Sequence, residues 1–349
     1  MNYVVNHERF KKIFVRSELK KYLPKQNRII EFPQYDKKYH NFFQLHAKEK
    51  YKLVKNNCLC GSKNDILISQ TDRHCVEFIT VICKSCGLIR AKNYFRNEDV
   101  EDFYKNFYRT DIYGGNDENL HPPDKYEEQK ISFKFRFDLL NKYKKKPLNN
   151  LKILDLGGGI GGVLDHFNNT NKKYLADYFD PYLKYAETKG IESIKGGLDK
   201  VNFKVDVVIL SHVIEHWNNF EYEIQKLINI QKKNQTLNYI EFPGVDSLKK
   251  GRRGGDFLGD IHVPHVYYFT SYVFENLMNR YGFEKIYLDD SIKSIFIYTG
   301  KKRSLINFFE LCQKDLFLAE KTRKIQIFKN LIKFFIPSFF LEVFRKFKK

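Results

Sequence analysis

Between residues 151 and 300, short apolar runs alternate with segments whose apolar residues recur at helical spacing. The runs LKILDL, KKYLADYFD, VDVVIL and TLNYIEF are predicted strands. The segments VLDHFNN, PYLKYAETKG, FEYEIQKLINIQKK and SYVFENLMNRYG are predicted helices, the last opened by a Thr-Ser cap. Such alternation favours a parallel, doubly wound sheet. Two further runs, FEKIYLDD and SIFIYTG, are separated only by a short turn, which predicts an antiparallel ending.

The rest of the chain has a different pattern. We expect an N-terminal extension at 1–55, a cysteine-rich module at 56–92 and a helical connector at 93–147. The α/β unit then covers 148–300, and 301–349 forms a basic helical tail that mixes Phe, Ile and Leu with Lys and Arg.

The chain is strongly basic, with a formal net charge of +19 over 349 residues. This favours an anionic partner, although lysines on a solvated surface give the same balance. The run KKGRR, with Lys249, Lys250, Arg252 and Arg253, is a candidate phosphate contact or a solvated loop. The first residues lack an apolar stretch of signal-peptide length, and no run reaches the roughly 18 apolar residues of a membrane span. We therefore expect a cytoplasmic protein.

The predicted strand LKILDL runs into a glycine-rich loop. Asp155, Gly157, Gly159 and Gly161 lie in LDLGGGIGG, and Asp180 follows 25 residues after Asp155, at the expected end of the second strand. Glycines here let a ligand approach the main chain, as dinucleotide-binding loops also do. An acidic residue before the loop suits a cationic ligand better than a pyrophosphate. Asp180 is a candidate ribose ligand and also a candidate helix cap.

The string LSHVIEHW contains the pattern H-x-x-E-H, the zinc signature of one class of metallopeptidases. That signature requires both histidines on one face of a regular helix. His212 follows directly on the predicted strand VDVVIL, so the helix begins only near Glu215. We therefore do not expect a peptidase site formed by this string.

Taken together, ILDLGGGIGG, YFDP, VDVVILSHVIEH and PHVYYFTSYVFENLMNRYGFE resemble class I S-adenosylmethionine-dependent methyltransferases over residues 151–300. The resemblance implies a Rossmann-like seven-stranded sheet and S-adenosylmethionine as cofactor. It also implies the cofactor-binding residues, which are Asp155, Gly157, Gly159, Gly161, Asp180, Ser211 and His212.

The cysteines gather in NCLCGS and VICKSCGLIR. The second string is a regular C-x-x-C, whereas one residue separates the two cysteines of the first. We expect a structural zinc ion, with candidate ligands Cys58, Cys60, Cys83 and Cys86. The fourth ligand is left open among Cys58, His74 and Cys75. The alternative is a ribbon held by its apolar core without zinc.

The segment from CGS through VICKSCGLIRAKNYF to FYKNFYR resembles the N-terminal zinc ribbon of bacterial sugar methyltransferases, including deoxysugar C-methyltransferases. In that family the ribbon helps to shape the acceptor side. The resemblance implies a sugar acceptor, nucleotide-linked or lipid-linked, in surface-glycan biosynthesis.

Methyl transfer is an in-line displacement, and a hydroxyl or carbon acceptor must also lose a proton. The segment GDIHVPHVYYFT supplies His265 as the favoured base or acceptor contact and His262 as the second candidate. Glu241 is a weaker candidate. The alternative for His265 is a structural role.

Two other functions are alternatives to that of a sugar methyltransferase. An RNA or small-molecule methyltransferase suits the charge, but the NPPY-type tetrapeptide of base methylases is missing after the fourth strand, and we do not expect a nucleic-acid partner. A cofactor-binding scaffold without activity is the non-enzymatic alternative. Residues 324–349 are expected to contact an anionic membrane peripherally, at its inner face, or to pack on the domain.

Overall fold

The computed structural model describes residues 39, 41–73, 76–112, 121–145 and 147–335. His74, Cys75 and the last part of the expected tail lie outside the described residues. Within the described ranges, no helix combines the length and apolar character needed to cross a membrane.

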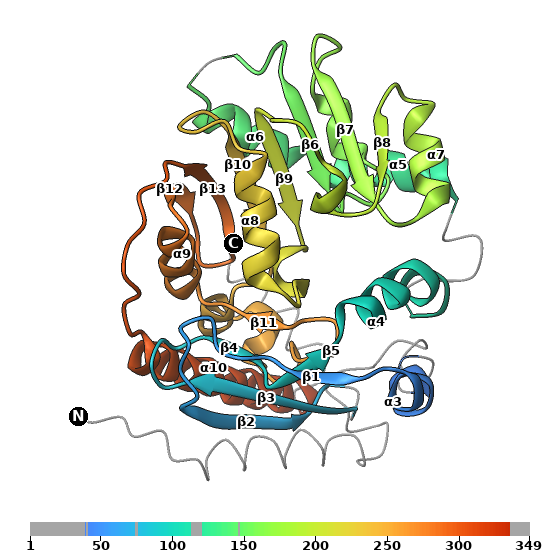
Figure 1. The fold of residues 1–349 in the computed structure, drawn as a ribbon. Coiled ribbons are helices and arrows are strands. Elements are labelled where there is room, and N and C mark those ends of the chain that lie inside the picture. The colour runs from blue at the N-terminus through green and yellow to red at the C-terminus, as the bar shows by residue number, and fades with distance from the viewer. Residues whose placement is uncertain (1–38, 40, 74–75, 113–120, 146, 336–349) are drawn as a thin grey trace.

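A seven-stranded sheet forms the upper part of the molecule (Figure 1), with the order β12-β13-β10-β9-β6-β7-β8. Its strands are β6 (Lys152–Leu156), β7 (Lys172–Asp177), β8 (Glu192–Lys195), β9 (Val207–Ser211), β10 (Leu237–Glu241), β12 (Phe283–Leu288) and β13 (Lys293–Tyr298). Strand β13 is antiparallel to both of its neighbours, and the other neighbouring strands pair in parallel. The α/β class and the antiparallel ending predicted from the sequence are thus confirmed.

Helices cover the two faces of this sheet. They are α5 (Pro122–Ser132), α6 (Lys134–Tyr143), α7 (Asp180–Glu187), α8 (Phe220–Asn229) and α9 (Ser271–Arg280). The predicted cap of α9 is present, because the Thr270 side chain accepts a hydrogen bond from the Val273 amide. The central strands are buried on both faces, which explains why they appear in the sequence as continuous apolar runs.

Two predictions about this sheet differ from the structure. The helix expected at VLDHFNN is only a 3-10 turn, η5 (Gly162–His166). Helix α5 lies directly against it, because a Cβ on Gly162 would come within 2.6 Å of the Tyr126 carbonyl oxygen. The chain enters β7 at Lys172, which leaves no room for a longer helix. The short edge strand β8 was not predicted, since its sequence ESIK is mostly polar.

The cysteine module forms a second sheet that also includes a strand from the α/β unit (Figure 1). Its strands are β2 (Asp65–Thr71), β3 (Glu77–Cys83), β4 (Ile89–Ala91) and β11 (Tyr267–Tyr268), in the order β11-β4-β3-β2. Strand β11 pairs antiparallel with β4. The segment that carries the candidate acceptor-side histidines is therefore joined by hydrogen bonds to the cysteine module.

Short elements surround the module. They are η2 (Phe42–His46), α3 (Ala47–Lys50), β1 (Leu53–Lys55), β5 (Asn93–Phe95), α4 (Asn97–Asp102) and the π-helix η3 (Phe103–Ile112). Strand β1 pairs with β5, so the expected helical connector begins with a strand. One buried apolar cluster runs continuously from these elements through the module to one face of the large sheet. A second cluster fills the opposite face of that sheet.

The first half of the C-terminal helix is part of the packed fold. Helix α10 (Phe309–Phe335) buries Cys312, Leu316 and Ala319. It packs on the 3-10 turns η8 (Val245–Lys250) and η9 (Arg252–Gly255). The described part of the expected tail therefore has an irregular segment at 301–308 and then continues as a packed helix.

Candidate active site

The glycine loop at the end of β6 has a backbone that requires glycine. Gly157, Gly159 and Gly161 have φ values of 65°, 65° and 78°. Residues other than glycine rarely adopt these left-handed backbone angles. The loop lies at the carboxyl ends of the parallel strands, where doubly wound sheets bind their ligands.

Asp155 is buried beneath this loop, with 2% of its surface exposed. Burial raises the pKa of Asp155 from its ordinary value of 3.8 to about 7. The Arg136 guanidinium opposes this shift, and the nearby Asp177 carboxylate adds to it. A cationic ligand placed beside Asp155 would offset the cost of the buried charge.

The pKa of Asp155 predicts a pH-dependent stability. Between about pH 4 and pH 7, folded Asp155 holds a proton that the unfolded chain has lost, so its contribution to stability falls as pH rises across this window. We expect D155N to remove this penalty and to stabilise the cofactor-free protein at pH 8 by on the order of 3 kcal/mol more than at pH 4. Urea denaturation at the two pH values measures the difference. An equal effect of D155N at both values would contradict it.

The acidic residue at the end of the second strand is Asp177, because β7 ends there and Asp180 is the first residue of α7. The placement of Asp180 at the strand end was therefore wrong. Asp180 is half exposed and forms an ion pair with Lys195. The Asp177 carboxylate instead accepts hydrogen bonds from the Gly159 amide (2.9 Å) and the Phe179 amide (3.0 Å). Sequence spacing missed Asp177 because the strand KKYLADYFD looked longer than it is.

The exit of β9 brings Ser211 and His212 to the same edge of the sheet as the glycine loop. His212 has a positive φ of 55°, and its amide donates to the Glu241 carbonyl oxygen at 2.8 Å. The next turn, η7 (Ile214–His216), is a 3-10 turn, so the H-x-x-E-H string does not lie on a regular helix.

The Glu241 carboxylate is hydrogen-bonded to neighbouring side chains. Its carboxylate accepts from the Arg136 guanidinium at 2.8 Å and from the Tyr239 hydroxyl at 2.9 Å. Arg136 itself is buried and was not singled out in the sequence, since a single arginine on a helix carries no motif. A carboxylate held in this way is poorly suited to accept a proton from an acceptor.

His262 and His265 lie together with His216, which comes from η7. The ring centroids of His262 and His265 are 3.8 Å apart, and those of His216 and His265 are 4.8 Å apart. Burial and the neighbouring histidines hold the pKa of His265 well below its ordinary range, and burial lowers the pKa of His216. Neutral imidazoles keep a lone pair at neutral pH, which suits a base or a ligand.

Hydrogen bonds from several parts of the chain fix the position of this histidine segment. The Val266 amide donates to the Glu215 carbonyl oxygen at 2.8 Å, and the Tyr94 hydroxyl donates to the Pro264 carbonyl oxygen at 3.3 Å. Together with the pairing of β11 and β4, these bonds attach the segment to both parts of the molecule.

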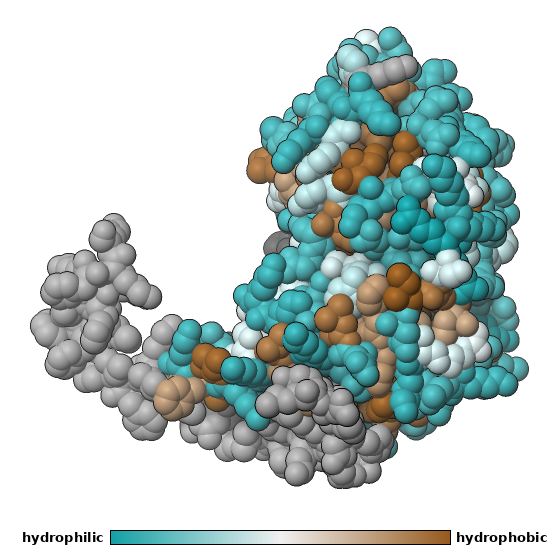
Figure 2. Space-filling view, turned by 90° about the vertical axis from the view of Figure 1, so that its left-hand side faces the viewer, coloured by the Kyte–Doolittle hydropathy of each residue, from teal (hydrophilic) through white to brown (hydrophobic). Residues whose placement is uncertain are grey.

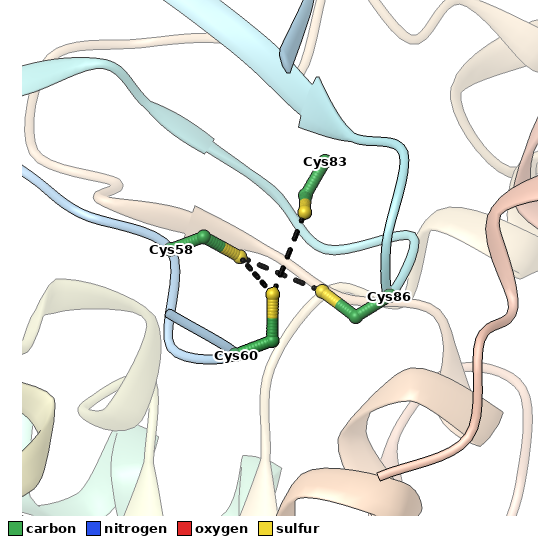
Figure 3. A group of neighbouring side chains, drawn as sticks. All are labelled: Cys58, Cys60, Cys83 and Cys86. Carbon is green, nitrogen blue, oxygen red and sulfur yellow. Dashed lines mark hydrogen bonds between the residues drawn. The ribbon is translucent and has the colours of Figure 1, made fainter. Parts of the chain in front are cut away.

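The four predicted cysteine ligands converge from two loops (Figure 3). The Sγ distances are 3.5 Å for Cys58–Cys86, 3.4 Å for Cys58–Cys60 and 3.6 Å for Cys60–Cys83. These are far longer than a disulfide bond, and all four thiols are free. The hydrogen bond to Cys83 raises the pKa of Cys58 to about 12. The irregular first string therefore still brings both of its sulfur atoms into the group.

The cations of the KKGRR run are engaged within the protein. Lys249 pairs with Asp315 at 2.8 Å and Lys250 with Asp290 at 2.6 Å. Arg252 forms an ion pair with Asp260. These pairs join η8 to α10 and to the turn between β12 and β13, and η9 to the loop that follows it. They leave the run less suited to a phosphate.

Residues 126–288, just under half of the chain, match the family model described as a methyltransferase domain. This range includes most of α5 and all of α6, which the sequence had placed in the connector. No curated protein matches the chain.

Several solved structures are similar to the chain. A SAM-dependent methyltransferase from Aquifex aeolicus is 15% identical, with 50% of this chain and 96% of that chain covered and a TM-score of 0.37. The plantazolicin methyltransferase BpumL in complex with SAH is 15% identical, with 64% and 88% covered and a TM-score of 0.39. The YcgJ protein from Bacillus subtilis is 14% identical, with 44% and 70% covered and a TM-score of 0.33.

The domain match covers the glycine loop, the acidic residues beneath and beside it, and most of the seven-stranded sheet. Residues 126–288 therefore form a methyltransferase domain, and the protein is an enzyme that transfers a methyl group.

Proposed function

We propose that this enzyme methylates a sugar, nucleotide-linked or lipid-linked, in bacterial surface-glycan biosynthesis. The observation that supports the proposal most is the attachment of the histidine segment to the cysteine module through β11 and β4. A ribbon that shapes the acceptor side is what the resemblance to sugar methyltransferases implies. RNA and other small molecules are the alternative acceptors.

The cofactor is proposed to bind along the carboxyl ends of β6, β7 and β9. Gly157, Gly159 and Gly161 would present the main chain, and Asp155 would face the cationic part of the cofactor. Asp177 takes the ribose role first assigned to Asp180, because its carboxylate lies beside the Gly159 amide. Ser211 and His212 would line the methionine side.

The cysteine group is proposed to hold a structural zinc ion. With Zn–S bonds of about 2.3 Å in a tetrahedron, neighbouring sulfur atoms are about 3.8 Å apart. The described Sγ distances of 3.4 to 3.6 Å are close to this spacing. Four protein ligands would leave no open position, so this ion would stabilise the fold without taking part in the reaction.

His265 is the residue we assign to the acceptor, with His262 beside it. We expect His265→Ala to lower kcat by about 100-fold or more, as removal of a group that assists proton loss does. S-adenosylmethionine affinity should stay unchanged, because His265 lies on the segment bonded to the cysteine module. Single-turnover kinetics and calorimetry separate the two effects. Normal turnover by His265→Ala would show that His265 does not assist methyl transfer.

The acceptor class is tested with labelled S-adenosylmethionine. We expect methyl transfer to nucleotide-linked or lipid-linked deoxysugars and none to transcribed RNA from the same source. Transfer to RNA but to no sugar would reject the sugar proposal and support the alternative.

The second half of α10 is proposed to contact an anionic membrane. The surface in Figure 2 is mostly hydrophilic, with hydrophobic residues in small groups. Ile325 and Phe328 on this half are 45% and 63% exposed, and lysines at 324 and 329 flank them. We expect truncation after Arg323 to abolish co-sedimentation with anionic liposomes, while the packed half of α10 stays folded. Equal binding by the truncated protein would reject this contact.

A further inference from the structure

A buried carboxylate near the end of β9 faces three histidines. Glu215 is 1% exposed. Its ion-pair partners among the described residues are His212 Nδ1 (3.2 Å), His216 Nε2 (3.8 Å) and His265 Nε2 (3.9 Å), all measured to Oε1. Its second oxygen, Oε2, is buried without a hydrogen-bond partner. A buried carboxylate is costly unless a cation neutralises it, and a metal ion between this carboxylate and the histidines would supply that charge.

The ring of His216 is oriented so that Nε2 faces Glu215. Its Nδ1 lies 2.7 Å from the Pro264 carbonyl oxygen and 2.9 Å from the Tyr104 hydroxyl. A carbonyl oxygen can only accept a hydrogen bond, so Nδ1 carries the proton and Nε2 keeps its lone pair. Histidines that bind metals usually donate their other N–H to such a carbonyl or carboxylate.

The geometry points to a divalent transition-metal site formed by Glu215, His216 and His265. Their ligand atoms all lie within 4.8 Å of one another. Ligands bound to one ion at about 2.1 Å are roughly 3.4 Å apart in a tetrahedron. The Glu215 oxygen would therefore approach each imidazole nitrogen by about half an ångström, and the two histidine nitrogens would close by at most about 1.4 Å. Two imidazoles and one carboxylate suit zinc, iron, cobalt or manganese and leave a position open.

This site differs in chemistry from the cysteine group. The four thiols make a closed site, whereas Glu215, His216 and His265 would leave a position for water or an acceptor oxygen. His212, half exposed and 3.2 Å from the same carboxylate oxygen, would border that position. The role of the ion toward an acceptor hydroxyl rests on the proposed function, but binding of the ion does not.

Cobalt is a suitable probe because its spectrum separates the two sites. Thiolate ligands give intense charge-transfer absorption, and nitrogen and oxygen ligands give only weak visible bands. We expect the wild type, stripped of metal and titrated with Co²⁺, to bind about one equivalent more than Glu215→Gln or His265→Gln. The exposed Glu221→Gln on α8 is the matched control and should bind as the wild type does.

Equal cobalt binding by the wild type and both variants, each shown to be folded by its melting curve, would overturn the metal site. That result would leave the proposed function intact if His265→Ala still loses turnover. Conversely, a bound ion in a protein that methylates no sugar would keep the metal site and reject the sugar acceptor.

Discussion

Asp177→Ala is expected to weaken S-adenosylmethionine binding by more than about 100-fold, whereas Asp180→Ala should leave it nearly unchanged. A carboxylate that accepts two hydrogen bonds from ribose hydroxyls contributes about 1.5 to 3 kcal/mol for each. Asp177 lies at the end of β7, buried and beside the glycine loop, and Asp180 is exposed and paired with Lys195. Calorimetric titration of both variants with S-adenosylmethionine measures the difference.

The Asp177 variant needs a control for loop geometry, because its carboxylate also accepts from the Gly159 and Phe179 amides. The Gly159 and Phe179 amides donate to different carboxylate oxygens, so Asp177→Asn keeps an acceptor for one of them while it removes the charge. It should bind weakly, with a smaller loss of Tm than Asp177→Ala. Loss of binding in Asp180→Ala together with normal binding in Asp177→Ala would return the ribose role to Asp180.

The sheet could be predicted from the sequence because its central strands are buried on both faces and appear as continuous apolar runs. The residues at which the strands end were harder to predict. The run KKYLADYFD stays apolar past Asp177, since Phe179 and Tyr182 pack on each other at the start of α7. Only the backbone shows where the strand stops, and that difference of three residues changed which aspartate faces the loop.

The parts of the candidate site that lie within one segment of the chain could be predicted from the sequence. The parts that bring together residues from distant segments could not. The glycine loop is local, and its positive φ angles follow from its composition. The group of Glu215, His216 and His265 joins two segments about 50 residues apart, held by the Val266 amide and the Pro264 carbonyl. The H-x-x-E-H string suggested His212 as the partner of His216, but in the structure His265 completes that group.

Loss of the proposed zinc ion is expected to destabilise the acceptor side before the cofactor side. The cysteine loops also receive bonds from elsewhere in the chain, since Arg280 donates to the Leu59 carbonyl and the Phe308 amide donates to the Cys86 carbonyl. Opening the group would therefore disturb the start of α10 and the pairing of β4 with β11. Among the residues that the structure describes, no such bond links the glycine loop to the cysteines, so the loop should retain the cofactor.

Cys83→Ser is accordingly expected to lose the zinc and to lower Tm by roughly 10 °C or more, because structural zinc contributes several kcal/mol to folding. Methyl transfer should be lost while S-adenosylmethionine binding persists. Cys312→Ala is the matched control: Cys312 is buried but lies outside the group, so the zinc content should stay unchanged. Elemental analysis and thermal melting measure both effects. A wild type without zinc and a Cys83→Ser variant with unchanged Tm would instead show a ribbon held by its apolar core, because only a bound ion makes one thiol matter so much more than another buried one.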